Sequence, residues 1–168
     1  MIFVALGTQD LPFNRLLRAM DDLVASGAVS EPVFAQTGFS DYAPVHYSYN
    51  NMMPFDDFAR KLQECDIFVS HGGTGSLVQG LKLGKRVVAA ARLRKYGEHV
   101  DDHQQEIIRV FSDAGLLIPV YEMEELGAAI ERARTFAPKP FETRRGELFA
   151  LLERFIEGEP GEKGGKTQ

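Results

Sequence analysis

The segment IFVSHGGTGSLVQGLKLGKRVVAAA, residues 67–91, decides the fold that this chain can form. It opens with a short apolar run, passes through a glycine-rich turn into a stretch of helical character that ends near Leu83, and closes with a second apolar run from Arg86. Two buried strands joined by a helix form a right-handed crossover, which makes the strands parallel members of one sheet. The segment therefore predicts an α/β protein.

The rest of the chain continues this alternation. Short apolar runs predict strands over residues 2–6, 32–36, 45–49, 66–69, 86–91 and 116–120. Helical spacing predicts helices over 13–26, 54–65, 74–83, 102–113, 122–136 and 141–156. We expect one Rossmann-like domain over residues 1–156, with a parallel sheet flanked by helices on both faces. Residues 157–168 are polar and glycine-rich, which predicts a disordered tail.

Composition narrows the class of protein. The chain has 168 residues, of which 44% are hydrophobic, enough for one domain with a sizeable core. Cys65 is the single cysteine, so a disulfide within the chain is impossible and a reducing cytoplasm is expected. The net charge of −5 argues against a nucleic-acid partner. The first residues lack the basic start of a signal peptide, and no apolar run approaches the ~20 residues of a membrane span.

The turn from Ser70 to Ser76 is the strongest candidate site. Ligands of open parallel sheets bind outside the carboxyl ends of the strands, and this turn follows one. Gly72, Gly73 and Gly75 leave the backbone unshielded and permit positive φ, and N–H groups at a helix start favour phosphate. Thr74 and Ser76 add hydroxyl groups, and His71 is a candidate to contact the phosphates or a departing diphosphate. The alternative is a tight turn with glycines for packing, since neither the Walker nor the Rossmann glycine pattern is present.

Two other segments follow strands. Gly7 and Thr8 end the first strand and face the same edge of the sheet, as phosphate or acceptor contacts or as a simple turn. Residues 96–105 are mostly polar, as a sugar with many hydroxyls requires, and the candidate ligands there are His99, Asp102, Gln104 and Gln105. Asp102 also suits a helix N-cap. A metal held by the histidines and Asp102 is the weaker hypothesis, because the spacing matches no closed zinc pattern, so we expect none.

A small basic cluster precedes this polar segment. It consists of Arg92, Arg94 and Lys95. A phosphate or a phospholipid-linked acceptor is one use for such a cluster, and a solvated loop is an equal alternative.

Together these residues resemble the nucleotide-sugar-binding C-terminal half of family 28 glycosyltransferases. The resemblance extends from Ile2 to about Ile156 and is most specific in SHGGTGS, residues 70–76, and YGEHVDDHQ, residues 96–104. It is strongest toward small stand-alone members. These are bacterial exopolysaccharide subunits of the PssE and EpsF type and the catalytic subunit of the eukaryotic dolichol-pathway N-acetylglucosaminyltransferase, with MurG more distant.

The resemblance implies roles for particular residues. The donor is a UDP-sugar, which is a substrate, and no cofactor is implied. Residues 72–76 would lie against its diphosphate, and Gln104, with Gln105, would contact its sugar. Gln79 stands where MurG-like enzymes have a glutamate that holds the ribose, and an amide lacks that charge. The backbone near Met53 and Phe55 would edge the uracil.

The resemblance also implies a partner. MurG-like enzymes carry a preceding domain that binds the acceptor, and the small members pair with a membrane-anchored protein that resembles it. We therefore expect a donor-binding subunit that transfers a hexose or uronic acid to a polyprenyl-diphosphate-linked saccharide, recruited to the cytoplasmic membrane face by its partner. The alternatives are a non-catalytic nucleotide-sugar-binding module and a stand-alone enzyme that acts on a small acceptor.

Overall fold

The computed structural model describes residues 1–142 together with residues 150 and 153. The predicted tail at 157–168 lies outside the described residues, as does nearly all of the predicted helix over 141–156. In order, the elements are β1 (Ile2–Ala5), α1 (Asn14–Ala25), β2 (Val33–Gln36), β3 (Ser48–Asn50), α2 (Phe55–Glu64), β4 (Ile67–His71), α3 (Thr74–Lys82), β5 (Arg86–Ala90), η1 (Arg94–Tyr96), α4 (His103–Asp113), β6 (Ile118–Val120), η2 (Met123–Glu125) and α5 (Leu126–Ala133).

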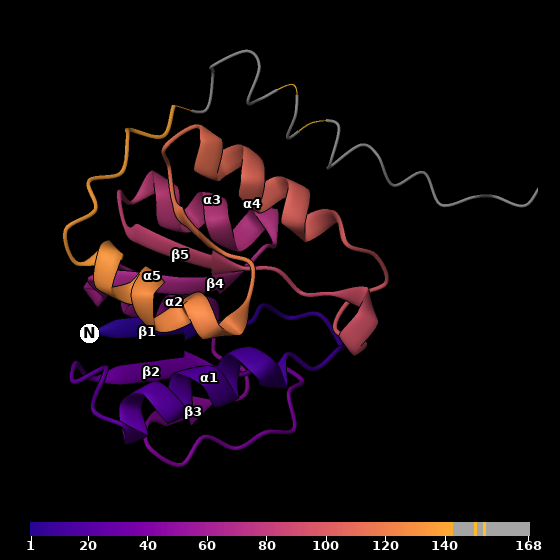
Figure 1. The fold of residues 1–168 in the computed structure, drawn as a ribbon, viewed down its shortest axis with the longest axis vertical. Coiled ribbons are helices and arrows are strands. Elements are labelled where there is room, and N and C mark those ends of the chain that lie inside the picture. The colour runs from indigo at the N-terminus through magenta and orange to yellow at the C-terminus, as the bar shows by residue number, and fades with distance from the viewer. Residues whose placement is uncertain (143–149, 151–152, 154–168) are drawn as a thin grey trace, which may run out of the picture.

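The strands form one sheet of six parallel strands in the order β3-β2-β1-β4-β5-β6, which confirms the predicted fold class (Figure 1). From β1 the chain builds outward through β2 and β3, then returns to the other side of β1 to place β4 and builds outward again. The order therefore reverses between β1 and β4. The loops that leave these two strands run in opposite directions at this switch point, which opens a crevice at the carboxyl edge of the sheet.

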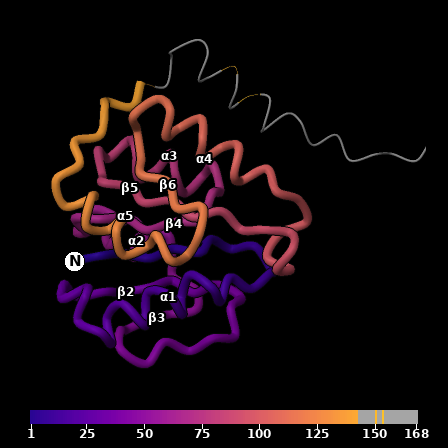
Figure 2. Tube along the Cα trace, in the orientation of Figure 1, coloured from indigo at the N-terminus to yellow at the C-terminus, as the bar shows by residue number. Residues whose placement is uncertain are grey.

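Each face of the sheet packs against its own set of helices. Alternate strand residues point to opposite faces, so Ile2 and Val4 join the core formed with α1 and α5, whereas Phe3 and Ala5 join the core formed with α2, α3 and α4. The tube in Figure 2 shows the chain wrapping the central strands on both sides. Cys65 lies in the second core, where its Sγ donates to the carbonyl of Leu62 over 3.2 Å. Burial raises the pKa of this thiol to about 11.

Several predicted boundaries are wrong. The strand predicted over 116–120 begins only at Ile118, and three other differences have a visible reason. The strand predicted over 45–49 begins at Ser48, because the N–H groups of Val45 and His46 donate to the Asp21 carboxylate instead of a neighbouring strand. The strand predicted to stop at residue 69 continues through His71, which pairs with Ala90. The helix predicted over 122–136 is divided into η2 and α5, and a capping box between Glu122 and Glu125 begins its first turn.

Candidate functional site

A pocket of about 470 Å³ opens at the carboxyl edge of the sheet, at the switch point between β1 and β4. It collects residues from the ends of β1, β2 and β4, from the loop before α2, and from the N-terminal parts of α2 and α3. The lining residues are Gly7, Thr8, Gln9, Gln36, Met53, Phe55, Phe58, His71, Gly73, Gly75, Ser76 and Gln79. Segments distant in the sequence therefore meet in one cavity.

The predicted site residues fall into two groups. Gly7, Thr8, Met53, Phe55 and Gln79 lie in the pocket with residues of the glycine turn. His99, Asp102, Gln104 and Gln105 do not line it. Of these, Gln104 is buried behind His71, and Asp102 and Gln105 are exposed. The proposed contacts of all these residues with a donor stay predictions.

His71 is enclosed by glycines. A Cβ on Gly7 would lie 2.5 Å from the imidazole Nε2, and a Cβ on Gly73 would lie 2.0 Å from Cε1, so any side chain at either position collides with the ring. Gly72, Gly73 and Gly75 do not adopt the positive φ that glycine permits. Close packing around His71 and Gln104 accounts for Gly72 and Gly73, because a Cβ on Gly72 would come within 2.6 Å of the Gln104 Cβ.

The third glycine of the turn has a different surrounding. A Cβ on Gly75 would meet nothing within 4 Å, yet Gly75 lines the pocket. Packing therefore leaves this position free, and the bare backbone of the first turn of α3 faces the cavity. The first N–H groups of a helix have no partner within it, so this turn offers donors and a partial positive charge.

The imidazole of His71 is neutral and oriented. Its Nδ1 accepts the N–H of Gly73 over 2.9 Å and lies 3.4 Å from the Gln104 amide nitrogen, so the ring proton sits on Nε2. Burial, together with the nearby positive charge of Arg92, lowers the pKa of His71 to about 3. Nε2 lies 3.4 Å from the Ser76 hydroxyl at the pocket wall. His71 therefore presents an N–H donor to the cavity.

Gln104 ties the ends of two strands together. The side chain is 5% exposed, and its Oε1 accepts the N–H of Gly72 and the N–H of Arg92, each over 3.0 Å. These two N–H groups follow β4 and β5. The amide Nε2 of Gln104 lies 3.4 Å from His71 Nδ1, so Gln104 supports the His71 ring from behind.

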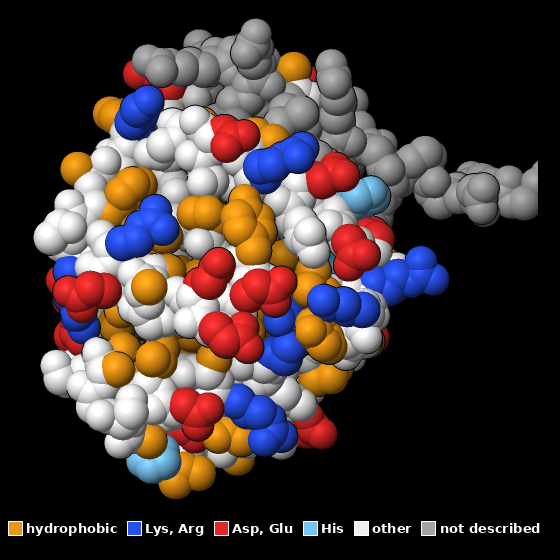
Figure 3. Space-filling model, in the orientation of Figure 1, with side chains coloured by type: hydrophobic (Ala, Val, Ile, Leu, Met, Phe, Trp, Pro, Cys, Tyr) orange, Lys and Arg blue, Asp and Glu red, His pale blue; other side chains and the backbone are white. Residues whose placement is uncertain are grey.

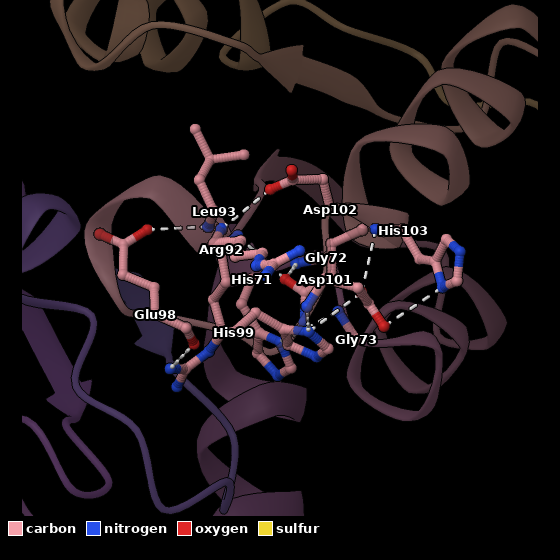
Figure 4. A network of polar contacts seen from close by, with 12 residues as sticks. His71, Gly72, Gly73, Arg92, Leu93, Glu98, His99, Asp101, Asp102 and His103 are labelled. Atoms are coloured by element: carbon pink, nitrogen blue, oxygen red, sulfur yellow. Dashed lines mark hydrogen bonds and ion pairs between the residues drawn. The ribbon is translucent and has the colours of Figure 1, made fainter. Parts of the chain in front are cut away.

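Arg92 contradicts both alternatives considered for the basic cluster, because it is neither exposed to a ligand nor part of a solvated loop. Its side chain is completely buried, and its guanidinium donates to the carbonyls of Leu6, Leu11 and Glu98. Figure 4 shows Arg92 beside Glu98. Burial lowers its pKa to about 10, so the side chain keeps its charge at neutral pH. Arg94 and Lys95 remain exposed.

Glu98 is likewise part of the scaffold. Its carboxylate makes a two-pronged ion pair with Arg15, at 2.7 and 2.8 Å, and accepts the N–H of Leu93. Arg92 and Glu98 thus hold the loops after β1 and β5 against each other.

Asp102 occupies the N-cap position of α4 without capping the helix. Its carboxylate accepts the N–H of Arg94 over 2.8 Å, and the first-turn N–H of His103 donates to Asp101 instead. Asp101 also lies within 3.3 Å of ring nitrogens of His99 and His103 (Figure 4). Within the part of the chain that the structure describes, no group of three or more metal-ligating side chains is placed to hold an ion.

Three pocket residues have no counterpart among the site residues predicted above, namely Gln9, Gln36 and Phe58. Gln36 ends β2, and Phe58 lies on the first turns of α2. A polar residue at the carboxyl end of an otherwise apolar parallel strand is the signal that points to Gln36. Phe58 carries no such signal, because helical spacing explains it as a core residue.

A second hollow of about 660 Å³ lies between α1 and the η2–α5 segment. It is lined by Arg15, Arg18, Asp22, Glu122 and Glu124 among others. Figure 3 shows acidic and basic side chains side by side on this face. The charges are therefore mixed here.

The strand order and the pocket at the switch point define a Rossmann-like domain with a ligand crevice at its carboxyl edge. The chain belongs to the glycosyltransferase family 28 C-terminal domain family, whose model matches residues 1–154. This confirms the predicted family. Among the described residues, no helix has the length and apolar character needed to cross a membrane.

Individual relatives agree with this placement. The chain is 29% identical over 102 residues to the UDP-N-acetylglucosamine transferase subunit ALG13 of Saccharomyces cerevisiae, a match that covers 57% of this chain and 48% of that protein. The match thus spans about half the length of this curated relative. The solution structure of ALG13 superposes with a TM-score of 0.58 at 17% identity, covering 93% of this chain and 94% of that one.

Larger enzymes contain the same fold as one of their parts. The glycosyltransferase of kitacinnamycin superposes with a TM-score of 0.59 at 17% identity, covering 94% of this chain and 40% of that one. The crystal structure of MurG from Acinetobacter baumannii superposes with a TM-score of 0.53 at 19% identity, covering 79% of this chain and 41% of that one. At these identities the likeness establishes the fold, which corresponds to one half of such two-domain enzymes.

Proposed function

We propose that this chain is the donor-binding catalytic subunit of a two-component glycosyltransferase. It transfers a hexose or uronic acid from a UDP-sugar to a polyprenyl-diphosphate-linked saccharide in exopolysaccharide, capsule or related glycan synthesis. The observation that carries the proposal is the pocket at the switch point, where the bare first turn of α3 and the neutral His71 offer N–H donors to one cavity. Family membership and the likeness to ALG13 support it.

The diphosphate of the donor lies against the first turn of α3. The N–H groups of this turn and the helix dipole neutralise phosphate charge, and the hydroxyl of Ser76 and the Nε2–H of His71 donate to phosphate oxygens. Gly72 and Thr74 complete the turn. A neutral imidazole donates without adding a buried charge, and a fixed donor costs little reorganisation when negative charge develops.

The transfer step breaks the bond between the anomeric carbon and the diphosphate. The acceptor hydroxyl oxygen forms the new bond to that carbon, its proton passes to a base on the partner side, and the electron pair of the broken bond goes to the leaving UDP. Donors placed at the first turn of α3 and at His71 stabilise the charge that collects there. The chain thus contributes leaving-group stabilisation, and we infer no metal in this role.

The remaining contacts divide between the two ends of the nucleotide-sugar. Met53 and Phe55 border the uracil, Gln79 reaches the ribose, and Gly7 and Thr8 flank the phosphates from the β1 side. The sugar faces Gln104 and Gln105, with His99 and Asp102 on the same loop. The positions of the pocket residues support the nucleotide contacts. The sugar contacts follow the family resemblance alone.

The acceptor and its base come from a membrane-anchored partner subunit. One Rossmann-like domain leaves its crevice open to water, and water weakens the electrostatic contacts that would stabilise a leaving diphosphate. A second protein that covers the crevice excludes this water and brings the acceptor to the cytoplasmic membrane face.

Titration with uridine nucleotides tests the proposal directly. The purified chain is expected to bind UDP and at least one UDP-sugar, measured by isothermal calorimetry. No binding to any uridine nucleotide would overturn the proposal. In the reconstituted pair, His71→Asn is expected to lower transfer much more than it lowers donor binding. Undiminished transfer would instead support the non-catalytic module, and transfer by the purified chain to a small acceptor would support the stand-alone enzyme.

A further inference from the structure

Gln36 occupies a position where the fold alone favours an apolar residue. It is the last residue of β2, between β1 and β3, with Ala5 and Asn50 as its register partners. Side chains of β2 alternate between the two faces of the sheet. Val33 and Ala35 join the core with α1, and Phe34 joins the core with α2. Gln36 therefore points to the α2 side, where the pocket opens.

The side-chain amide of Gln36 is buried without a full set of partners. Only 4% of the residue is exposed, and its Oε1 has no hydrogen-bond partner among the described residues. Its Nε2 donates to the thioether of Met52 over 3.7 Å, a weak acceptor. Buried polar groups in folded proteins are nearly always hydrogen-bonded, so an unpartnered acceptor that lines a pocket marks the place of a missing donor.

The position of Gln36 along the pocket identifies that donor. His71 ends β4 and Gln36 ends β2, with β1 between them, so the two residues stand about two strand spacings, or roughly 10 Å, apart across the sheet. A nucleoside bridges such a span. The phosphate-binding donors lie at the His71 end, whereas Gln36 lies at the end bordered by Met53, Phe55 and Phe58. These apolar side chains suit the flat faces of a base.

We infer that Gln36 recognises the base of the donor nucleotide, its Oε1 accepting the N3–H of the uracil imide. The inference rests on the proposed function and adds a specificity residue to it. Met52 engages the Nε2 end of the amide, so Oε1 is the end of the side chain that has no partner among the described residues. A base inserted beside Met53 and Phe58 presents its imide N–H at its edge, where a buried acceptor is available.

A coupling experiment with three ligands tests this inference. The dissociation constants of UDP, N3-methyl-UDP and 2′-deoxy-UDP are measured by calorimetry for the wild type, Gln36→Ala and the near-isosteric Gln36→Met. One hydrogen bond corresponds to about a tenfold change in affinity. We expect Gln36→Ala to weaken UDP and 2′-deoxy-UDP about tenfold, and to leave N3-methyl-UDP within about threefold of its wild-type affinity. Gln36→Met is expected to weaken UDP to the same extent.

The controls separate this inference from the proposed function. Gln79→Ala, at the proposed ribose contact, is expected to weaken UDP and N3-methyl-UDP alike. Thermal unfolding checks that the Gln36 variants fold. We expect them to fold, because the substitutions remove an oxygen that has no hydrogen-bond partner in the described structure. Equal weakening of UDP and N3-methyl-UDP by both Gln36 variants would overturn the inference. The inference would also be overturned if Gln36→Ala weakened UDP but not 2′-deoxy-UDP, because Gln36 would then contact the 2′-hydroxyl and not N3. If the wild type binds no uridine nucleotide, the proposed function fails first.

Discussion

His71 is a buried histidine whose ring is neutral in the folded protein, and this has a consequence for pH. Its pKa is about 3 in the folded state, against an ordinary value of 6.5 in the unfolded chain. Below pH 6.5 the unfolded chain therefore binds a proton that the folded protein does not, so stability is complete above that pH and falls as pH decreases toward 3.

The size of this loss can be measured by substitution. We expect the His71 contribution to reach about 2 kcal/mol at pH 5 relative to pH 7.5, because each pH unit in the window is equivalent to about 1.36 kcal/mol. Urea unfolding of the wild type and His71→Asn at pH 7.5, 6 and 5 isolates it, since the other histidines contribute equally to both proteins. Curves that stay parallel over this range would show that His71 is not the group responsible.

Two glycines of the same turn are expected to respond in opposite directions. Gly73→Ala places a methyl 2.0 Å from the His71 ring and is expected to destabilise the fold by about 1–3 kcal/mol. Gly75→Ala meets nothing within 4 Å and is expected to raise stability by up to about 1 kcal/mol, because alanine favours helix. The methyl at position 75 nevertheless enters the pocket, so UDP affinity should fall. Chemical unfolding and calorimetry of the pair check both signs, and a tighter-binding Gly75→Ala would contradict the placement of the diphosphate.

At the scale of elements, one side chain joins the ends of β4 and β5. Gln104→Met keeps the volume of Gln104 but leaves the N–H groups of Gly72 and Arg92 without their acceptor. Each orphaned N–H is expected to reduce the free energy of unfolding by about 1–3 kcal/mol. The exposed neighbour supplies the control, since Gln105→Met should change stability by less than about 0.5 kcal/mol. A Gln104→Met protein as stable as this control would mean that the bridge has no energetic role.

The elements themselves were largely predictable from sequence, because apolar strands and amphipathic helices are local patterns. The residues at which these elements begin and end were less predictable. β3 begins late because Asp21, on a different helix, binds the backbone at Val45 and His46. No window of sequence around residue 45 contains that information. The same is true of Arg92, whose burial depends on the Leu6 and Leu11 carbonyls far away in the chain.

The candidate site was predictable to the extent that topology determines it. Turns after β1 and β4 must meet at the carboxyl edge once the sheet is parallel, so Gly7, Thr8 and the glycine turn were expected together. The distinction between a ligand-facing and a scaffold residue was not predictable. Gln104, Glu98 and Asp102 share the polar character of ligands, and only the three-dimensional contacts show that their oxygens accept backbone N–H groups or pair with Arg15.

For the molecule as a whole, the open pocket predicts a division of labour between binding and transfer. If the chain is the proposed donor-binding subunit, it supplies the donor contacts alone, so its affinity for UDP is expected to change by less than about tenfold when the proposed acceptor-binding partner is added. Sugar transfer, in contrast, is expected only with the partner present. Calorimetry and a transfer assay with and without partner-containing membranes test this, and full transfer activity of the chain alone would contradict it.

Cys65 gives this protein an intrinsic reporter of its own motions. The thiol is buried between α2 and β4, and its raised pKa leaves almost no reactive thiolate at neutral pH. An alkylating reagent can therefore modify the chain only when the α2–β4 junction opens, and as the single cysteine it gives one unambiguous signal. Because α2 and β4 both border the pocket, an occupied pocket should slow the modification, so mass spectrometry can follow ligand engagement without any added label.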